Sequence, residues 1–199
     1  MAYFAQAIYT KQGMVRGNPF PDKKVLHIGC GASKLAGSLG MDVLALPGVD
    51  VVHNLDHFPW PVAENSQDIV FAHSVVEHLS DMVGFMNEVW RVLKPGGRVI
   101  ITVPYFRSVD SFTDVTHKHF FSSKSMNYFI EGAGGLSDYA YTEKLFTKIG
   151  FWYGWPQESN NPFVRFLKQF ITENQYEYDQ FLSLLFPMKI LVWELEVSK

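Results

Sequence analysis

The feature that most constrains the fold is an apolar segment, Val25 to Ile28, that runs directly into the glycine pair Gly29 and Gly31. A strand followed by such a turn lets backbone N–H groups approach a ligand closely, because neither glycine carries a Cβ. The dinucleotide-binding motif G-x-G-x-x-G requires a third glycine, and Lys34 occupies that position in this chain. A long side chain there disfavours a pyrophosphate ligand of the nicotinamide or flavin kind. The turn therefore predicts a ligand without a diphosphate.

Apolar segments of strand length alternate with segments of helical periodicity along the chain. The expected strands are residues 24–28, 41–46, 49–53, 68–73, 98–103, 142–153 and 189–197, and the expected helices are residues 2–10, 74–93, 162–171 and 176–185. Residues 142–153 also fit a helix that ends at Gly150, and we favour the strand. Gly37, Gly40, Pro47 and Gly48 disfavour a full-length helix after the first strand. The alternation predicts a mostly parallel sheet covered on both faces.

The composition limits the class of protein and its partners. A chain of 199 residues, 47% of them hydrophobic, is expected to form one domain, with a core over about 24–155 and C-terminal helices and a final strand over 156–199. The net charge of −3 supplies no broad basic field, which disfavours nucleic-acid binding. The single cysteine, Cys30, excludes an internal disulfide and a cysteine-based zinc cluster. The sequence has no apolar run of roughly 18–20 residues and no signal-peptide pattern, so we expect a cytoplasmic protein without a membrane span.

Polar and glycine residues follow several of the expected strands. In an open parallel sheet, ligands bind at the carboxyl ends of the strands, near the point where the strand order reverses. That rule selects the turn 29–33 after the first strand, Asp42 in the second strand and Asn54 after the third. It also selects His73 with Ser74, and residues 104–106. These residues are the candidates for a ligand site.

Several longer motifs resemble one known family. They are the strand with G-C-G, the stretch A-H-S-V-V-E-H-L at 72–79, the unit E-V-W-R-V-L-K-P-G-G-R-V-I-I-T-V-P at 88–104, the segment D-V-T-H-K-H-F-F at 114–121 and the ending F-P-M-K-I-L-V-W-E-L-E-V at 186–197. Together they resemble the type-11 methyltransferase domain of the class I S-adenosylmethionine-dependent methyltransferases, over nearly the whole chain from Val25. Three positions depart from the family pattern: His27 replaces an acidic residue, Ser33 replaces a glycine, and Asn54 replaces an aspartate.

The resemblance implies a Rossmann-like, doubly wound fold, with a mostly parallel seven-stranded sheet and helices on both faces. It also implies S-adenosylmethionine as the cofactor. The positions that would contact it are His27, Gly29, Cys30 and Gly31 around the methionine part, Asp42 at the ribose, Asn54 and Leu55 at the adenine, and His73 near the methionine part. The implied reaction transfers a methyl group to a small acceptor such as a sugar or another metabolite. The alternatives are a module of the same fold that binds the cofactor without transfer, and a nucleotide-dependent oxidoreductase, which Lys34 disfavours.

The long polar segment 107–125 supplies the candidates for catalysis. His117 and His119 would lie where an acceptor approaches, and histidine is suited to accept a proton near neutral pH. We predict His117 as the base or acceptor contact, with His119 as a second candidate. The two histidines could instead bind a metal with Asp110 or Asp114, but no full ligand set is fixed and we predict no metal. Glu77 and His78 are expected to cap and orient the helix that follows them, with a direct catalytic role as the alternative.

Overall fold

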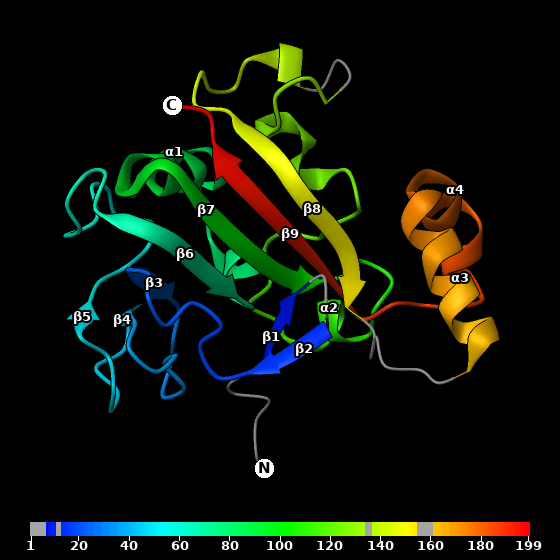
Figure 1. Ribbon diagram of the computed structural model, residues 1–199, viewed down its shortest axis with the longest axis horizontal. Coiled ribbons are helices and arrows are strands. Elements are labelled where there is room, and N and C mark those ends of the chain that lie inside the picture. The colour runs from blue at the N-terminus through cyan, green and yellow to red at the C-terminus, as the bar shows by residue number, and fades with distance from the viewer. Residues whose placement is uncertain (1–6, 11–12, 134–136, 155–160) are drawn as a thin grey trace.

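The computed structural model describes residues 7–10, 13–133, 137–154 and 161–199, and Figure 1 shows their arrangement. The strands are β1 (Ala7–Thr10), β2 (Gly13–Arg16), β3 (Val25–Ile28), β4 (Leu39–Asp42), β5 (Val51–Val52), β6 (Gln67–His73), β7 (Leu93–Pro104), β8 (Phe146–Gly154) and β9 (Ile190–Val197). The α-helices are α1 (Met82–Val92), α2 (Asp110–Thr113), α3 (Pro162–Glu173) and α4 (Gln175–Gln180). Short 3-10 helices are η1 (Val76–His78), η2 (Ser125–Phe129), η3 (Ser137–Tyr139) and η4 (Leu182–Leu184). None of the helices described has the length and apolar character needed to cross a membrane.

Seven strands form one sheet in the order β5-β4-β3-β6-β7-β9-β8, which confirms the predicted mostly parallel sheet. The pairs among β5, β4, β3, β6 and β7 are parallel, whereas β9 runs antiparallel to both of its neighbours. The chain first builds outward from β3 to β5 and then returns to the other side of β3 with β6. The strand order therefore reverses between β3 and β6, and the ligand end of such a sheet lies beside that reversal.

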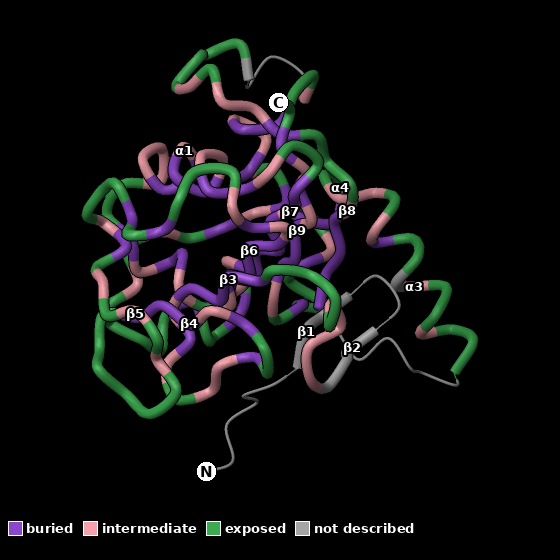
Figure 2. The backbone as a smooth tube through the Cα atoms, turned by 60° about the vertical axis from the view of Figure 1, so that its left-hand side comes forward, coloured by how far each residue is buried: buried purple, intermediate pink, exposed green. Residues whose placement is uncertain are grey.

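The side chains of the sheet alternate between two clusters of buried residues. Leu26 and Ile28 of β3 belong to the larger cluster, which α1 covers with Phe85, Met86, Val89 and Val92. Val25 of β3 belongs to the smaller cluster, together with Ile69, Phe71, Ile100, Trp152 and Val192 from four other strands. In Figure 2 the buried residues follow the central strands, while most of α3 is exposed.

The cover of the smaller cluster differs from the expected layer of helices. Its contributions from outside the sheet are Leu35 and Phe20, which lie in turns and loops. The chain from residue 29 to 38 forms turns and no helix, as Gly37 predicts, because glycine lowers helix stability. A short apolar turn thus replaces a crossover helix on this face.

The loop between β5 and β6 also contains no helix, and an ion pair fixes it to α1. Arg91 Nη2 lies 2.6 Å from Glu88 Oε1 and also donates to the carbonyl oxygens of Trp60 and Val62. Glu88 Oε1 accepts from the backbone N–H of Trp60 at 2.6 Å. Pro59 and Pro61 prevent regular structure here, so the side chains of Glu88 and Arg91 form the hydrogen bonds to the backbone of this loop instead.

Two expected helices differ from the structure. Residues 7–10 of the helix predicted at 2–10 form β1, which pairs antiparallel with β2, and residues 2–6 lie outside the described chain. The β-branched and aromatic residues Ile8, Tyr9 and Thr10 favour a strand. The helix predicted from Ser74 begins only at Met82, where Asp81 Oδ1 accepts from the N–H of Gly84 at 2.8 Å. Glu77 and His78 therefore cap no α-helix and lie in η1.

Candidate functional site

The glycine turn after β3 is closed on one side and open on the other. Gly29 has φ of +60° and its N–H donates to the Met41 carbonyl at 2.8 Å. A Cβ built on Gly29 would lie 2.4 Å from Val75 Cγ2, so only glycine fits against the end of β6. Gly31 has φ of +52°, and a Cβ there would meet no heavy atom within 4 Å in the described structure. The open side of the turn is at Gly31.

Asp42, at the end of β4, is held by two backbone donors. Its Oδ2 accepts from the N–H of Gly31 at 2.8 Å, and its Oδ1 accepts from the N–H of Leu44 at 2.9 Å. The residue is buried to 9% exposure. Each carboxylate oxygen can accept more than one hydrogen bond, so a fixed acceptor remains for ligand hydroxyls. Asp42 and the Gly29–Gly31 turn are therefore adjacent, as the strand-end rule predicts.

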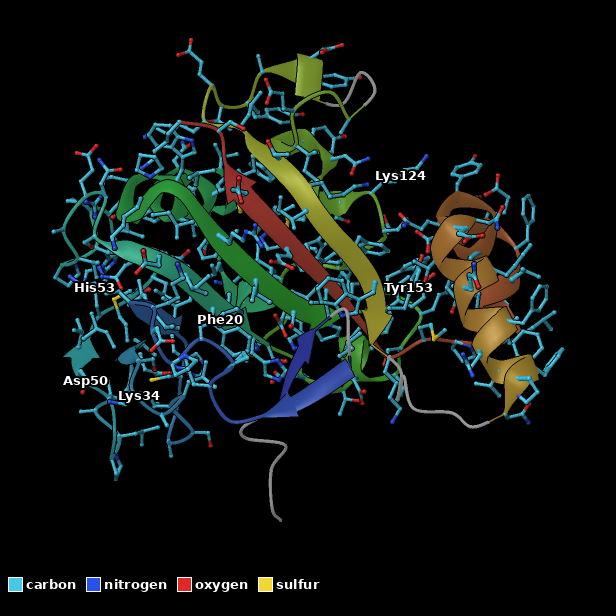
Figure 3. All side chains as sticks on the ribbon, viewed as in Figure 1. Phe20, Lys34, Asp50, His53, Lys124 and Tyr153 are labelled. Carbon is cyan, nitrogen blue, oxygen red and sulfur yellow. The ribbon has the colours of Figure 1, made fainter. Side chains whose placement is uncertain are left out.

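Lys34 and Cys30 fill the space behind the turn. Lys34 Nζ lies 2.7 Å from Asp50 Oδ2, and Figure 3 shows the two side chains near β4. A Cβ on Gly40 would lie 2.5 Å from Lys34 Cδ, so the lysine stem crosses β4 at a position that requires glycine. Cys30 is buried, and burial raises the pKa of its thiol. Lys34 thus links the connection between β3 and β4 to Asp50 in the connection between β4 and β5.

His27 lies beneath the turn, on the side of the smaller cluster. Its Nδ1 accepts from the N–H of Leu35 at 3.1 Å, which places the imidazole proton on Nε2. Burial and, to a smaller extent, His73 lower the pKa of His27 to about 4, while Asp42 acts in the opposite direction. Burial also lowers the pKa of His73, whose ring stacks on Phe71 with centroids 6.1 Å apart. Both histidines are therefore held neutral at pH 7.

We predict that His27 makes the protein sensitive to acid. The imidazole titrates near 6.5 in the unfolded chain and at about 4 in the folded protein. Between these values only the unfolded state binds the proton, so stability falls as the pH drops from about 6.5 to 4, by up to about 3 kcal/mol. Urea unfolding across this range measures the loss. In His27→Asn, whose Oδ1 can replace Nδ1 as the acceptor for Leu35, the slope should shrink; an unchanged slope would assign it to other groups.

The adenine candidates lie in the loop after β5. Asn54 is exposed and its Oδ1 accepts from the N–H of Asp56 at 3.0 Å. Leu55 is 5% exposed and packs in the larger cluster, while its carbonyl accepts from Trp60 Nε1 at 3.1 Å. Asn54 therefore remains accessible, whereas the Leu55 side chain is directed into the core. Their contacts with adenine remain predictions.

A cavity of about 610 Å³ opens at the carboxyl ends of β6 and β7. It is lined by Ser74, Glu77, His78, Pro104, Asp110, Thr113, Asp114, Val115 and His117. The cavity thus joins the strand-end candidate Ser74 to the histidine segment predicted from the sequence. Ser74 has φ of +49°, a conformation that costs energy for a residue with a Cβ and that is frequent at functional sites.

Glu77 is the buried acidic group in the cavity wall, although its sequence position favoured a capping role over a catalytic one. It is 1% exposed, and within the described chain neither of its carboxylate oxygens has a hydrogen-bond partner. Burial, with a smaller contribution from the nearby Asp114, raises its pKa to about 7. Its carbonyl accepts from the N–H groups of Lys118 at 2.8 Å and His119 at 3.2 Å, which fixes the segment 117–119 against η1.

His117 and His78 lie beside Glu77, but His119 does not join them. His117 Nε2 is 3.9 Å from Glu77 Oε1, and the rings of His78 and His117 are 4.7 Å apart. His119 Nε2 is buried without a hydrogen-bond partner in the described residues, and its ring lies 6.4 Å from that of Phe121. Among the described residues, the group of side chains that could hold a metal ion contains His117 but not His119. The sequence signal for Glu77 and His78 is their position, three and four residues after Ser74 at the end of a strand.

Comparison with known proteins finds similarity to methyltransferases over part of the chain. The model of the methyltransferase domain family matches residues 26–101. A probable S-adenosylmethionine-dependent methyltransferase of Mycolicibacterium smegmatis is 44% identical over 59 residues, which cover 29% of this chain and 22% of that protein. The mitochondrial ubiquinone biosynthesis O-methyltransferase of Rattus norvegicus is 30% identical over 110 residues, covering 43% of this chain and 32% of that protein. The chain therefore spans less than a third of the length of these two relatives.

Solved structures share the fold at lower sequence identity. The crystal structure of a SAM-dependent methyltransferase from Archaeoglobus fulgidus aligns with a TM-score of 0.57 and 17% identity, over 89% of this chain and 87% of that one. A putative methyltransferase from Bacillus halodurans aligns with a TM-score of 0.55 and 14% identity, over 88% and 93%. The fold and the match over residues 26–101, which is less than half of the chain, make this chain similar to S-adenosylmethionine-dependent methyltransferases. The cofactor that this similarity indicates is S-adenosylmethionine.

The residues at the turn fit that cofactor. A ribose needs a hydrogen-bond acceptor for its hydroxyls, and Asp42 presents a carboxylate already oriented by two N–H groups. The open side of Gly31 leaves room for a ligand next to this carboxylate. The neutral His73 at the end of β6 suits the neighbourhood of a positively charged sulfonium better than a protonated imidazole would.

Proposed function

We propose that this protein transfers a methyl group from S-adenosylmethionine to a hydroxyl group of a small acceptor molecule. The observation that carries the proposal is the cavity of about 610 Å³ at the carboxyl ends of β6 and β7, with three titratable side chains grouped in its wall. A cavity of this volume suits a small molecule. Its position at the strand ends, beyond Ser74, allows an acceptor to reach the cofactor end of the site.

The residues around the turn have distinct proposed roles. Gly29 and Gly31 would hold the methionine part, Asp42 the ribose hydroxyls and Asn54 the adenine amino group. When bound, the cofactor supplies a methyl group on a sulfonium, which is already electrophilic. The contribution of the chain is then alignment, because holding two reactants in the reactive geometry can accelerate a reaction greatly.

The lining of the cavity supports a neutral or cationic acceptor that reacts through oxygen. Glu77, Asp110 and Asp114 bring acidic groups to the wall, which disfavours an anionic acceptor. His117 lines the cavity, with its Nε2 3.9 Å from Glu77 Oε1, and would contact the acceptor. The similarity to a relative named as an O-methyltransferase supports an oxygen acceptor.

Thermal stability with candidate ligands tests the proposal. S-adenosylhomocysteine at 100 times its Kd should stabilise the protein by about 2.7 kcal/mol, whereas nicotinamide cofactors should not. Asp42→Asn keeps the size of the side chain but removes its charge, and it should need a higher ligand concentration for the same shift. Absence of stabilisation by both S-adenosyl ligands would overturn the proposal. Stabilisation without turnover on hydroxylated acceptors would favour a binding module.

A further inference from the structure

Three side chains in the cavity wall lie close enough together to share one ion. Glu77, His78 and His117 each offer one ligand atom, and these atoms all lie within 4.8 Å of one another. Glu77 Oε1 and His117 Nε2 are 3.9 Å apart. Two atoms bound to the same tetrahedral Zn²⁺ ion at about 2.0–2.2 Å are separated by roughly 3.3–3.6 Å. The Glu77–His117 separation of 3.9 Å is only slightly wider than this, and small side-chain rotations would bring all three atoms into range.

Both histidines are held in the tautomer that a metal site requires. His117 Nδ1 is 2.9 Å from the Ser111 carbonyl, which can only accept, so the proton is on Nδ1. Thr116 Oγ1 donates its proton to Asp114 Oδ1 at 2.7 Å and therefore accepts from His78 Nδ1 at 2.9 Å. Each imidazole thus keeps its lone pair on Nε2. Metal-binding histidines typically donate their other N–H to a carboxylate, a backbone carbonyl or water, and His117 follows this pattern with the Ser111 carbonyl.

Glu77 provides a second, independent observation. It is 1% exposed, and both of its carboxylate oxygens are buried without a hydrogen-bond partner among the residues described. A buried carboxylate without a hydrogen bond or counter-charge is costly, and such groups are rare in folded proteins. A bound cation would satisfy both oxygens and balance the charge.

We infer that Glu77, His78 and His117 bind a divalent transition-metal ion, with Zn²⁺ as the best fit. One carboxylate and two imidazoles suit this class of ion, and three protein ligands leave a position open toward the cavity. On the basis of the proposed function, the acceptor hydroxyl occupies that position.

The bound ion would lower the pKa of the acceptor hydroxyl. The O–H bond breaks, the proton passes to water and the electron pair stays on the acceptor oxygen, so nothing is oxidised or reduced. His117 is then a metal ligand and replaces the general base predicted from the sequence. Asp114 is a positioning residue that orients His78 through Thr116.

Metal titration of the full chain tests the site directly. Protein stripped with a chelator is titrated with Zn²⁺ by calorimetry and with Co²⁺ by visible absorption. We expect one high-affinity equivalent and the spectrum of a four- or five-coordinate Co²⁺ ion. Glu77→Gln and His117→Gln should each weaken Zn²⁺ binding at least 100-fold. Asp114→Asn should weaken it about 10–100-fold. His57→Gln, which removes an exposed imidazole from the loop after β5, should bind as the wild type does.

The outcomes separate this inference from the proposed function. Absence of tight Zn²⁺ binding, or equal affinity in His117→Gln, would overturn the metal site and leave Glu77 as a buried neutral acid. If circular dichroism shows that Glu77→Gln is unfolded, His117→Gln decides the question. The same samples are tested with S-adenosylhomocysteine: stabilisation without Zn²⁺ binding rejects only the metal site. Zn²⁺ binding without such stabilisation rejects the proposed cofactor.

Discussion

Replacing Asp179 with alanine is expected to lower the free energy of unfolding by about 3–5 kcal/mol. Asp179 in α4 is 8% exposed, and its Oδ1 accepts from the hydroxyls of Tyr105 at 2.8 Å and Tyr153 at 2.9 Å. Its Oδ2 accepts from the N–H of Ser123 at 2.9 Å. Hydrogen bonds to a charged group contribute about 1.5–3 kcal/mol each, and their removal leaves buried donors unpaired. In Figure 3, Tyr153 lies at the end of β8 that faces the C-terminal helices.

Urea unfolding of a matched series measures this effect. Tyr153→Phe removes one of the three hydrogen bonds and should cost about 1.5–3 kcal/mol, less than Asp179→Ala. The environment explains why the phenols remain donors: burial and the Asp179 carboxylate raise the pKa values of Tyr105 and Tyr153 well above the ordinary value. A loss below about 1 kcal/mol in Asp179→Ala would show that α4 is not held to the sheet by this carboxylate.

Replacing Gly29 with alanine is expected to cost about 2–5 kcal/mol of stability and to abolish cofactor binding at ordinary concentrations. The left-handed conformation at φ of +60° contributes about 1–2 kcal/mol of this. The remainder comes from the new Cβ, which would lie 2.4 Å from Val75 Cγ2. Overpacking of this kind typically costs about 1–3 kcal/mol, and here it displaces the turn from the end of β6.

Two companion variants isolate the steric clash. Gly31→Ala carries a similar φ of +52° but meets no atom within 4 Å, so it should lose only the conformational part. Val75→Ala provides the partner for a double-mutant cycle, measured by urea unfolding and by ligand-induced thermal shifts. The two substitutions should be strongly coupled, because shortening Val75 makes room for the new methyl group. If Gly29→Ala costs as much in the Val75→Ala background, the contact with Val75 is not the cause.

Most of the sheet could be predicted because its strands are short apolar runs bounded by strong turn residues. Val25 to Ile28, Arg98 to Val103 and Lys189 to Val197 lie within or next to observed strands. The helix predicted at 2–10 was wrong over residues 7–10, because the four residues of β1 carry little periodicity and pairing with β2 decides their conformation. The sequence predicted that no full-length helix follows the first strand. It did not predict that Leu35 covers the smaller cluster instead, because that contact depends on tertiary packing.

The candidate site divides in the same way. Gly29 follows β3, and Asp42 and His73 end β4 and β6, so local pattern and one topological rule predict that they lie at the same edge of the sheet. Glu77 and His117 are separated in the sequence by the whole of α1 and β7, and their meeting depends on the docking of segment 117–119 onto η1. Nothing local distinguishes His117 from His119, because only the packed loop determines which imidazole faces Glu77.

The position of β9 has a consequence for how the chain acquires this structure during synthesis. Among the described residues, β8 pairs with the sheet through β9 alone, yet β9 follows it after the segment 155–189. When β8 leaves the ribosome, its sheet partner has not yet been made, and Trp152 and Tyr153 still lack their pairing partners Val192 and Leu191. The nascent chain must therefore keep an aromatic strand unpaired until β9 inserts beside β7. This delay makes β8 the segment most exposed to aggregation and to chaperone binding.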